Sequence, residues 1–460
     1  MKNDHRKLER YRMKNTVVAF ALLFGVLWLL AGSITANNPN RAMADSVTTE
    51  YESENQILLR IDSTSTLNDY LSYAALKSHS LRQAFYHWKA ALEKTGYAGA
   101  LPDPMISYGY FIENVETRVG PQNQKLSLKQ SIPWFGTLGA RKDIANESAN
   151  VAFRKYQAEK LKLFYSARAA YYDLYYLGRE ISLTKGNFEL LKFWESVART
   201  KYKVALKKHP DIIKAQVELG KLEDRLLTLQ DKIGPTVARL KAVVNLADTF
   251  SIVVPAAIEI MEVEVELRTV LNDALQNSPN LNAMIHFIDK EKAGVRLAQK
   301  ASLPNFTIGV DYIETGEALS PSMEDSGKDT WVVGVGLNLP IWFGKNKAKK
   351  NEARAKLRAA EYRYADSQNR LEALVEKIVF QYSDALRKTR LYRDGLIPKA
   401  EQALNASYTA YQAAETDFLN VLDAQRQLLA FQLQYERAIA DLATRRAEIE
   451  MITGNELLNK

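Results

Sequence analysis

The chain has 460 residues, a formal net charge of +8 and no cysteine. The absence of cysteine excludes disulfide bonds, thiolate metal sites, a cysteine nucleophile and a lipid anchor attached through cysteine. Residues 1–44 contain seven basic and two acidic residues, a surplus that leaves only +3 for the rest of the chain, so nucleic acid is not expected as a partner.

Residues 1–44 have the three-part layout of a secretory signal peptide. Basic residues up to Lys14 precede an uninterrupted apolar run, Thr16–Leu30, and an Ala-x-Ala match ends at Ala44. The run is shorter than the ~20 residues of a membrane-spanning helix, although an uncleaved anchor is the alternative. Three residues fit as the cleavage point, Ser33, Ala36 and Ala44, and two could begin translation, Met1 and Met13. In each case the bulk of the protein is expected to leave the cytoplasm.

The rest of the chain is predicted to consist of an N-terminal arm and two similar halves. The arm, residues 45–66, is polar and lacks clear periodicity. The halves cover residues 67–255 and 256–460, and each contains a Trp-Phe-Gly junction, within Ser131–Gly136 and Leu339–Gly344. These junctions lie 208 positions apart, a period that indicates two duplicated halves rather than a solenoid.

Each half is predicted to begin with a helix of about 30 residues and to continue with two strands. Apolar and polar residues alternate in two segments of each pair region, about 105–134 and about 305–342, namely Met105–Asn114, Gln124–Trp134, Asn305–Glu314 and Thr330–Trp342. Each strand has about 10–13 residues, close to the 9–11 that a tilted strand needs to cross a bilayer, and its polar face suits a wet lumen. Residues 115–123 and 315–329 are expected to be the loops between the strands. A soluble sheet that packs one face on a protein core is the alternative.

Four strands cannot close a barrel, and an open edge in lipid leaves backbone N–H and C=O groups unpaired. Three copies of the chain would supply twelve strands, which is enough for an open pore. The strand count therefore predicts a homotrimer in a lipid bilayer. Trp134 and Trp342 end the strand regions and are expected to lie at the membrane interface as anchors, where amphipathic rings prefer to sit.

Long helical hairpins are predicted after the junctions, over about 140–247 and about 347–452. Apolar residues recur there at spacings of three and four, which is typical of coiled-coil-like packing. A helix of about 65 residues would span roughly 95–100 Å. Seven basic residues near the start of the second hairpin are interpreted as a solvated helix face, namely Lys345, Lys347, Lys349, Lys350, Arg354, Lys356 and Arg358.

No catalytic or cofactor-binding pattern is found in the sequence. The five histidines are not paired at metal-ligand spacing, and there is no Ser/His/Asp layout or phosphate-binding loop. We therefore expect no enzyme activity, no cofactor and no metal site.

Several segments match the pattern of a known family, namely Asn277–Leu281, the two Trp-Phe-Gly junctions, Val421–Arg426 and the closing Thr453-Gly454. Through these segments the chain resembles the TolC-like outer-membrane efflux factors. The resemblance implies a mainly helical protomer with membrane strands, which completes a twelve-stranded barrel and a helical tunnel as a trimer. It places the channel in the outer membrane of a Gram-negative-type cell, with a long periplasmic portion. A periplasmic adaptor would dock on the hairpin tips, and an inner-membrane pump would supply the energy for a passive exit duct.

The resemblance also implies a gate at the periplasmic tips, with Tyr411 and Asp423 at the matching positions. Asp211 and Asp417 are candidate tip residues too, and both fit equally as helix caps that follow a turn. A secreted coiled-coil scaffold or adaptor without a pore is the alternative function. Drugs, metal ions and exported polypeptides pass through ducts of this family, and the sequence selects none of them.

Overall fold

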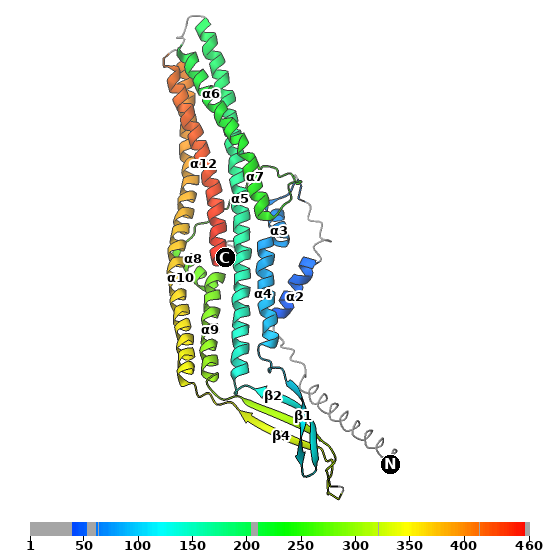
Figure 1. Cartoon of the computed structure of the whole chain (residues 1–460). Helices are drawn as coiled ribbons and strands as arrows, with labels where there is room; N and C mark the ends of the chain where they lie inside the picture. The colour runs from blue at the N-terminus through cyan, green and yellow to red at the C-terminus, as the bar shows by residue number, and fades with distance from the viewer. Residues whose placement is uncertain are drawn as a thin grey trace. The chain divides into compact units, whose positions relative to one another are not determined.

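The computed structural model of the chain describes residues 39–52, 61–62, 64–203, 210–320, 322–413 and 415–455. The predicted signal peptide lies outside these residues as far as residue 38. Helices and one sheet of four strands make up the regular structure of the described residues (Figure 1). None of the helices in the described ranges is both long and apolar enough to cross a membrane.

Two compact units can be separated within the chain. The first combines residues up to Ala44 with Lys89–Asn150 and His286–Tyr362; the second combines Asp45–Trp88, Val151–Ile285 and Arg363–Lys460. The whole sheet belongs to the first unit. Each unit takes segments from both predicted halves, so the halves interleave. The repeat boundaries at 67–255 and 256–460 stay a prediction.

Helix α2 (Pro39–Glu52) begins inside the predicted signal peptide and continues into the predicted arm. Ala44 is 1% exposed, and the ring of Tyr51 lies 5.2 Å from the ring of Phe85. These contacts order the segment as far as Glu52. The first part of the predicted arm is therefore helical, and the assignment of residues 45–66 as an arm stays a prediction.

The opening helix of each half is in fact two helices, with the break at a serine. The four helices are α3 (Leu67–Lys77), α4 (His79–Tyr97), α8 (Leu267–Asn277) and α9 (Pro279–Lys300). Ser78 and Ser278 have ψ angles of 122° and 117°, far from the helical value. Pro279 also disfavours a helical conformation for the serine before it. The predicted single helices are corrected accordingly.

The four strands form one antiparallel sheet in the order β1-β2-β3-β4, and its strands are β1 (Met105–Thr117), β2 (Gly120–Ile132), β3 (Phe306–Thr315) and β4 (Thr330–Leu337). Val310 is the partner of both Leu128 in β2 and Val333 in β4. The two halves thus contribute adjacent strand pairs to a single sheet. Strands β1 and β4 are its two edges.

Two strand boundaries differ from the prediction. Residues 115–123 were expected as a loop, but β1 continues to Thr117 and β2 starts at Gly120. Gly120 has φ +131°, and the backbone of Gly316 leaves no room there for a Cβ atom. Strand β4 ends at Leu337 rather than near residue 342, because Pro340 has no N–H for a ladder hydrogen bond.

The long helical tracts are present in both halves. The elements are α5 (Thr137–Lys203), α6 (Pro210–Asp231), α7 (Ile233–Val244), α10 (Phe343–Leu391), the π-helix η2 (Tyr392–Leu396), α11 (Ile397–Gln412) and α12 (Phe418–Thr453). α5 alone has 67 residues and α10 has 49. Gly454, with φ +71°, ends α12 and confirms the predicted helix stop. The predicted fold class, long helices with four strands, is confirmed.

Candidate functional site

The first candidate region is the sheet of the first unit, whose two faces differ in character. One face carries exposed apolar residues on β1, β3 and β4, among them Ile106, Tyr108, Ile308, Val333 and Val335. On the opposite face Lys125 forms an ion pair with Asp311 at 3.0 Å, across β2 and β3. Leu126 and Tyr312 on the same face are buried, but most of its apolar side chains are exposed among the described residues. A sheet with such a face can meet lipid on that face and water on the other.

Polar pairs bound the apolar face near the β1–β2 turn. The side chain of Gln124 donates to Glu314 across the strands, and Asn114 donates to Asn123 at 3.3 Å. These groups lie toward the end of the sheet that carries the strand-connecting loops. Polar ends around an apolar middle are the pattern of strands that cross a bilayer.

The two Trp-Phe-Gly junctions lie at the other end of the sheet, where strands lead into helices. The ring of Trp134 stacks on Phe306 at 5.6 Å, whereas Trp342 is 69% exposed. Gly136 has φ +82° just before α5, while Gly344 already lies within α10, which starts directly after Trp342. The two junctions therefore share a position and differ in backbone. Their prolines differ as well, because Pro133 directly precedes Trp134, whereas one residue separates Pro340 from Trp342.

The second candidate region is the helix end around Tyr411, in the second unit. Tyr411 is 1% exposed, and its ring lies 5.3 Å from Phe418 at the start of α12. Burial, together with the nearby charge of Asp211 in the first turn of α6, raises the pKa of Tyr411 to about 12. Tyr411 and Asp211, which come from different halves, are thus brought close together. A neutral phenol of α11 thus lies near a buried carboxylate of α6 at this end of the hairpins.

Asp417 and Asp423 occupy different positions at the same end. Asp417 is the N-cap residue of α12 and has extended backbone, with φ −83° and ψ 154°. Asp423 is exposed and accepts a hydrogen bond from Arg426 at 3.1 Å. Arg426 also reaches Glu218 of α6 at 2.5 Å. The carboxylates of two hairpins therefore share one guanidinium.

The repeated Ala-Gln pairs of the two halves both connect to α5. Gln216 of α6 donates to Glu195 at 3.1 Å, and Gln425 of α12 donates to the Asn187 carbonyl at 3.2 Å. Gln425 is 4% exposed, so this hydrogen bond satisfies a buried amide. Equivalent residues of the repeat are thus used on one common helix. The alignment of Ala215-Gln216 with Ala424-Gln425 marks both positions in the sequence but not their shared partner.

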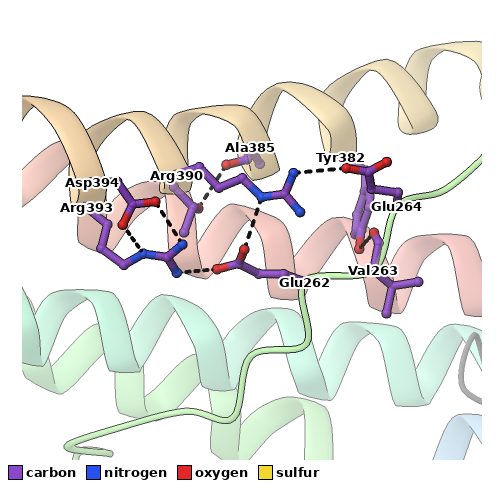
Figure 2. A network of polar contacts seen from close by, with 9 residues as sticks. Glu262, Val263, Glu264, Tyr382, Ala385, Arg390, Arg393 and Asp394 are labelled. Atoms are coloured by element: carbon purple, nitrogen blue, oxygen red, sulfur yellow. Dashed lines mark hydrogen bonds and ion pairs between the residues drawn. The ribbon is translucent and has the colours of Figure 1, made fainter.

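A third polar network surrounds the π-helix η2 (Figure 2). Arg393 of η2 and Arg390 of α10 both bind Glu262, which lies in the extended connection between the halves. The hydrogen bonds from Arg393, and then from Arg390, hold the pKa of Glu262 below its usual range. The hydroxyl of Tyr382 donates to the carbonyl of Val263 at 2.7 Å. These bonds attach the extended segment that contains Glu262 and Val263 to α10 and to the π-helix η2, which lies between α10 and α11.

Acidification is expected to weaken the contact between Glu218 and Arg426. The hydrogen bond from Arg426 lowers the pKa of Glu218, so the contact stabilises the fold above the ordinary pKa of ~4.3 and is lost as the pH falls through the lowered value. Because Arg426 is 47% exposed, the contribution should be about 0.5–1 kcal/mol. The measurement is the urea midpoint of wild type and Glu218→Gln at neutral and acidic pH. The difference between the two proteins should shrink on acidification, and a constant difference would contradict the assignment.

No group of three or more His, Cys, Asp or Glu side chains suited to a metal ion occurs within the described ranges. The polar networks above link helices to one another. They consist of ion pairs and buried hydrogen bonds that connect elements distant in the sequence.

Comparison with known proteins gives a consistent set of relatives. Residues 270–455 match the family described as outer membrane efflux protein. The chain is 26% identical over 184 residues to the cobalt-zinc-cadmium resistance protein CzcC of Cupriavidus metallidurans, an alignment that covers 40% of this chain and 42% of CzcC. It is 21% identical over 411 residues to the pyoverdine export outer membrane protein OpmQ of Pseudomonas putida. This alignment covers 84% of this chain and 84% of OpmQ.

A solved structure shares the fold over most of the chain. The outer membrane protein VceC of Vibrio cholerae superposes with a TM-score of 0.69 and 18% sequence identity. The superposition covers 85% of this chain and 96% of that one. The resemblance stated from the sequence is confirmed by these matches.

Proposed function

We propose that this chain, whose residues 270–455 form an outer membrane efflux protein domain, is the outer-membrane exit duct of a tripartite efflux system. It conducts substrates passively from the periplasm to the outside, while an inner-membrane pump supplies the energy and a periplasmic adaptor joins the two. The observation that carries the proposal is the antiparallel sheet with an uncovered apolar face and two open edges. A water-exposed protein would not leave both unpartnered.

Closure of the sheet requires further copies of the chain. The four strands alternate in direction, so β4 of one copy can pair antiparallel with β1 of the next. Three copies give a barrel of twelve strands, and the face with Lys125 and Asp311 then lines a wet lumen. Trp134 and Trp342 would lie at the periplasmic interface of the bilayer. The open edges support association of several copies, since lipid cannot satisfy their backbone groups, and a homotrimer is the proposed closure.

The helix end around Tyr411 is proposed as the periplasmic gate. Its support is the closeness of Tyr411 and Asp211, together with the exposed carboxylate of Asp423 on Arg426. Asp417 is the N-cap residue of α12 at the same end. Opening the duct would then separate α6 from α12 and break the Glu218–Arg426 contact. The adaptor would dock on the same hairpin ends.

Export to the outer membrane is proposed to use residues 1–44 as a signal peptide. Basic residues followed by the apolar run Thr16–Leu30 support this. The relatives are named for metal resistance, pyoverdine export, and toxin and drug export. Such different cargoes on one fold favour a duct whose cargo is chosen by its pump.

Reconstitution of the purified chain in a planar bilayer tests this function. We expect insertion as a trimer and discrete conductance steps. Chemical cross-linking of the same preparation should stop at three copies. A water-soluble monomer that is missing from outer-membrane fractions and gives no conductance would favour the alternative, a secreted coiled-coil scaffold without a pore.

A further inference from the structure

We propose that four lysines at the start of α10 bind anionic phospholipid headgroups in the periplasmic leaflet of the outer membrane. These residues are Lys345, Lys347, Lys349 and Lys350, referred to below as the elbow lysines. The inference rests on the proposed function, because it needs the sheet in a bilayer. It gives a role to the basic run that the sequence alone presents as a solvated helix face.

The elbow lysines form a cluster of positive charge with little compensation among the described residues, where the nearest acid along the chain is Glu352, which interacts electrostatically with Lys349. Lys345, Lys347 and Lys349 are exposed, and Lys350 is half-buried. Among the described residues none of the four forms an ion pair, and the first turn of α10 has no acidic residue. Further along the helix, by contrast, Lys356 pairs with Glu352 at 2.6 Å. Four neighbouring cations that form no ion pair among the described residues raise the local concentration of anions.

Their distance from the sheet suits a membrane surface. Lys345 follows Trp342 by three residues and Lys350 follows it by eight, so a helical rise of 1.5 Å per residue places all four within roughly 12 Å of the ring's level. The attraction of an anionic leaflet falls off within a Debye length of about 8–10 Å. Arg354, Lys356 and Arg358 lie roughly 18–24 Å away along the axis and should feel little of it.

The lysines also continue an apolar surface that is suited to lipid. Trp342 and Phe343 immediately precede them and are 69% and 80% exposed. An exposed aromatic pair followed by basic residues is the usual order at a membrane interface, where rings sit at headgroup level and cations meet phosphate. The occupant that fits this order is a bilayer leaflet rather than a nucleic acid, since no aromatic residue interleaves the lysines for base stacking.

The first junction lacks the same cluster. After Trp134 the next basic residues are Arg141 and Lys142, and Asp143 beside them pairs with Arg296 at 2.8 Å. The two strand-to-helix junctions of one protomer thus differ in charge. Anionic lipid would gather at the second junction, three times around the trimer.

The test measures lipid retained by the full-length protein. Wild type is incorporated into vesicles of phosphatidylethanolamine, with or without phosphatidylglycerol, and the co-purified lipids are quantified. Each lysine near a membrane surface strengthens anionic lipid binding about fivefold. The lipid that co-purifies with wild type should therefore be enriched in phosphatidylglycerol by at least about fivefold relative to the vesicle mixture. The enrichment should be smaller at high salt. The variant with all four elbow lysines replaced by glutamine should retain the two lipids in their bulk ratio.

The matched control replaces Arg354, Lys356 and Arg358 with glutamine and should keep the enrichment. Equal loss in this control, or no enrichment by wild type, would overturn the inference. Displacement of the enriched lipid by inorganic phosphate at matched ionic strength would also overturn it, in favour of a free anion. Both variants should insert into pure phosphatidylethanolamine vesicles as wild type does. If wild type itself fails to insert there, the proposed function falls, and this outcome is separate from the lipid ratio.

Discussion

Replacing Val333 with lysine is expected to remove most of this protein from the outer membrane. Val333 lies in the middle of β4, opposite Val310, and is 74% exposed on the apolar face. A lysine on a lipid-facing strand near the bilayer midplane costs about 2–4 kcal/mol, and the trimer would carry it three times. The measurement is the amount of assembled trimer in outer-membrane fractions separated by density.

Val332→Lys is the matched control, because adjacent strand residues point to opposite faces. Val332 pairs with Asp311, so a lysine there would stand beside a carboxylate on the polar face. We expect this variant to assemble at close to the wild-type level. If both variants assemble normally, the apolar face does not meet lipid and the scaffold alternative gains. If both variants fail equally, a side chain as large as lysine is not tolerated at either position of β4. The result would then show no difference between the apolar and the polar face.

The second large effect is expected at Glu436, which holds α12 against α5. Glu436 is 5% exposed and accepts hydrogen bonds from Tyr175 at 2.6 Å and Arg179 at 2.8 Å. Burial, and then the bond to Glu436, raises the pKa of Tyr175, so the phenol stays a donor over the whole physiological range. Glu436→Leu strands both donors and should cost about 2–4 kcal/mol of unfolding free energy. Urea denaturation of the purified protein measures this.

Two further variants distinguish the free-energy cost of leaving the Tyr175 and Arg179 donors unpaired from the cost of lost packing. Asp441→Leu removes a partly exposed acid of α12 that pairs with Arg437 at 2.8 Å, and it should cost less than about 1 kcal/mol. The triple variant Glu436→Leu, Tyr175→Phe, Arg179→Leu removes the stranded donors and should recover most of the loss. This account is contradicted if Glu436→Leu lowers the unfolding free energy no more than Asp441→Leu does. It is also contradicted if the triple variant is no more stable than Glu436→Leu.

The sequence predicts the strands and the long helices well, because their periodicities are local. Period-two alternation identifies all four strands, and the Thr453-Gly454 stop matches a left-handed glycine. The helix breaks at Ser78 and Ser278 were missed, since helical residues continue on both sides of each. The polar stretch 115–123 resembles a loop, yet pairing of Gln122 with Thr315 of the other half keeps it in the sheet.

Contacts between distant segments are the part that sequence patterns do not supply. Glu436 and Tyr175 are 261 positions apart, and nothing near either residue indicates the other. Asp211 and Asp417 were singled out by their place after a turn, and Asp423 by the family resemblance. In the structure Asp211 is buried near Tyr411, while Asp423 is exposed and bound to Arg426. The gating role of these residues stays a prediction.

The short segment between Leu337 and Phe343 sets the rotational phase of α10 relative to the strands. One residue inserted in this segment would rotate α10 by about 100° about its axis, whereas the side chains of β4 would still point to the same faces of the sheet. Ala360, which is 3% exposed, would then rotate out of contact. Homologous chains should therefore hold the length of this segment constant. Length, more than residue identity, is what the junction has to keep.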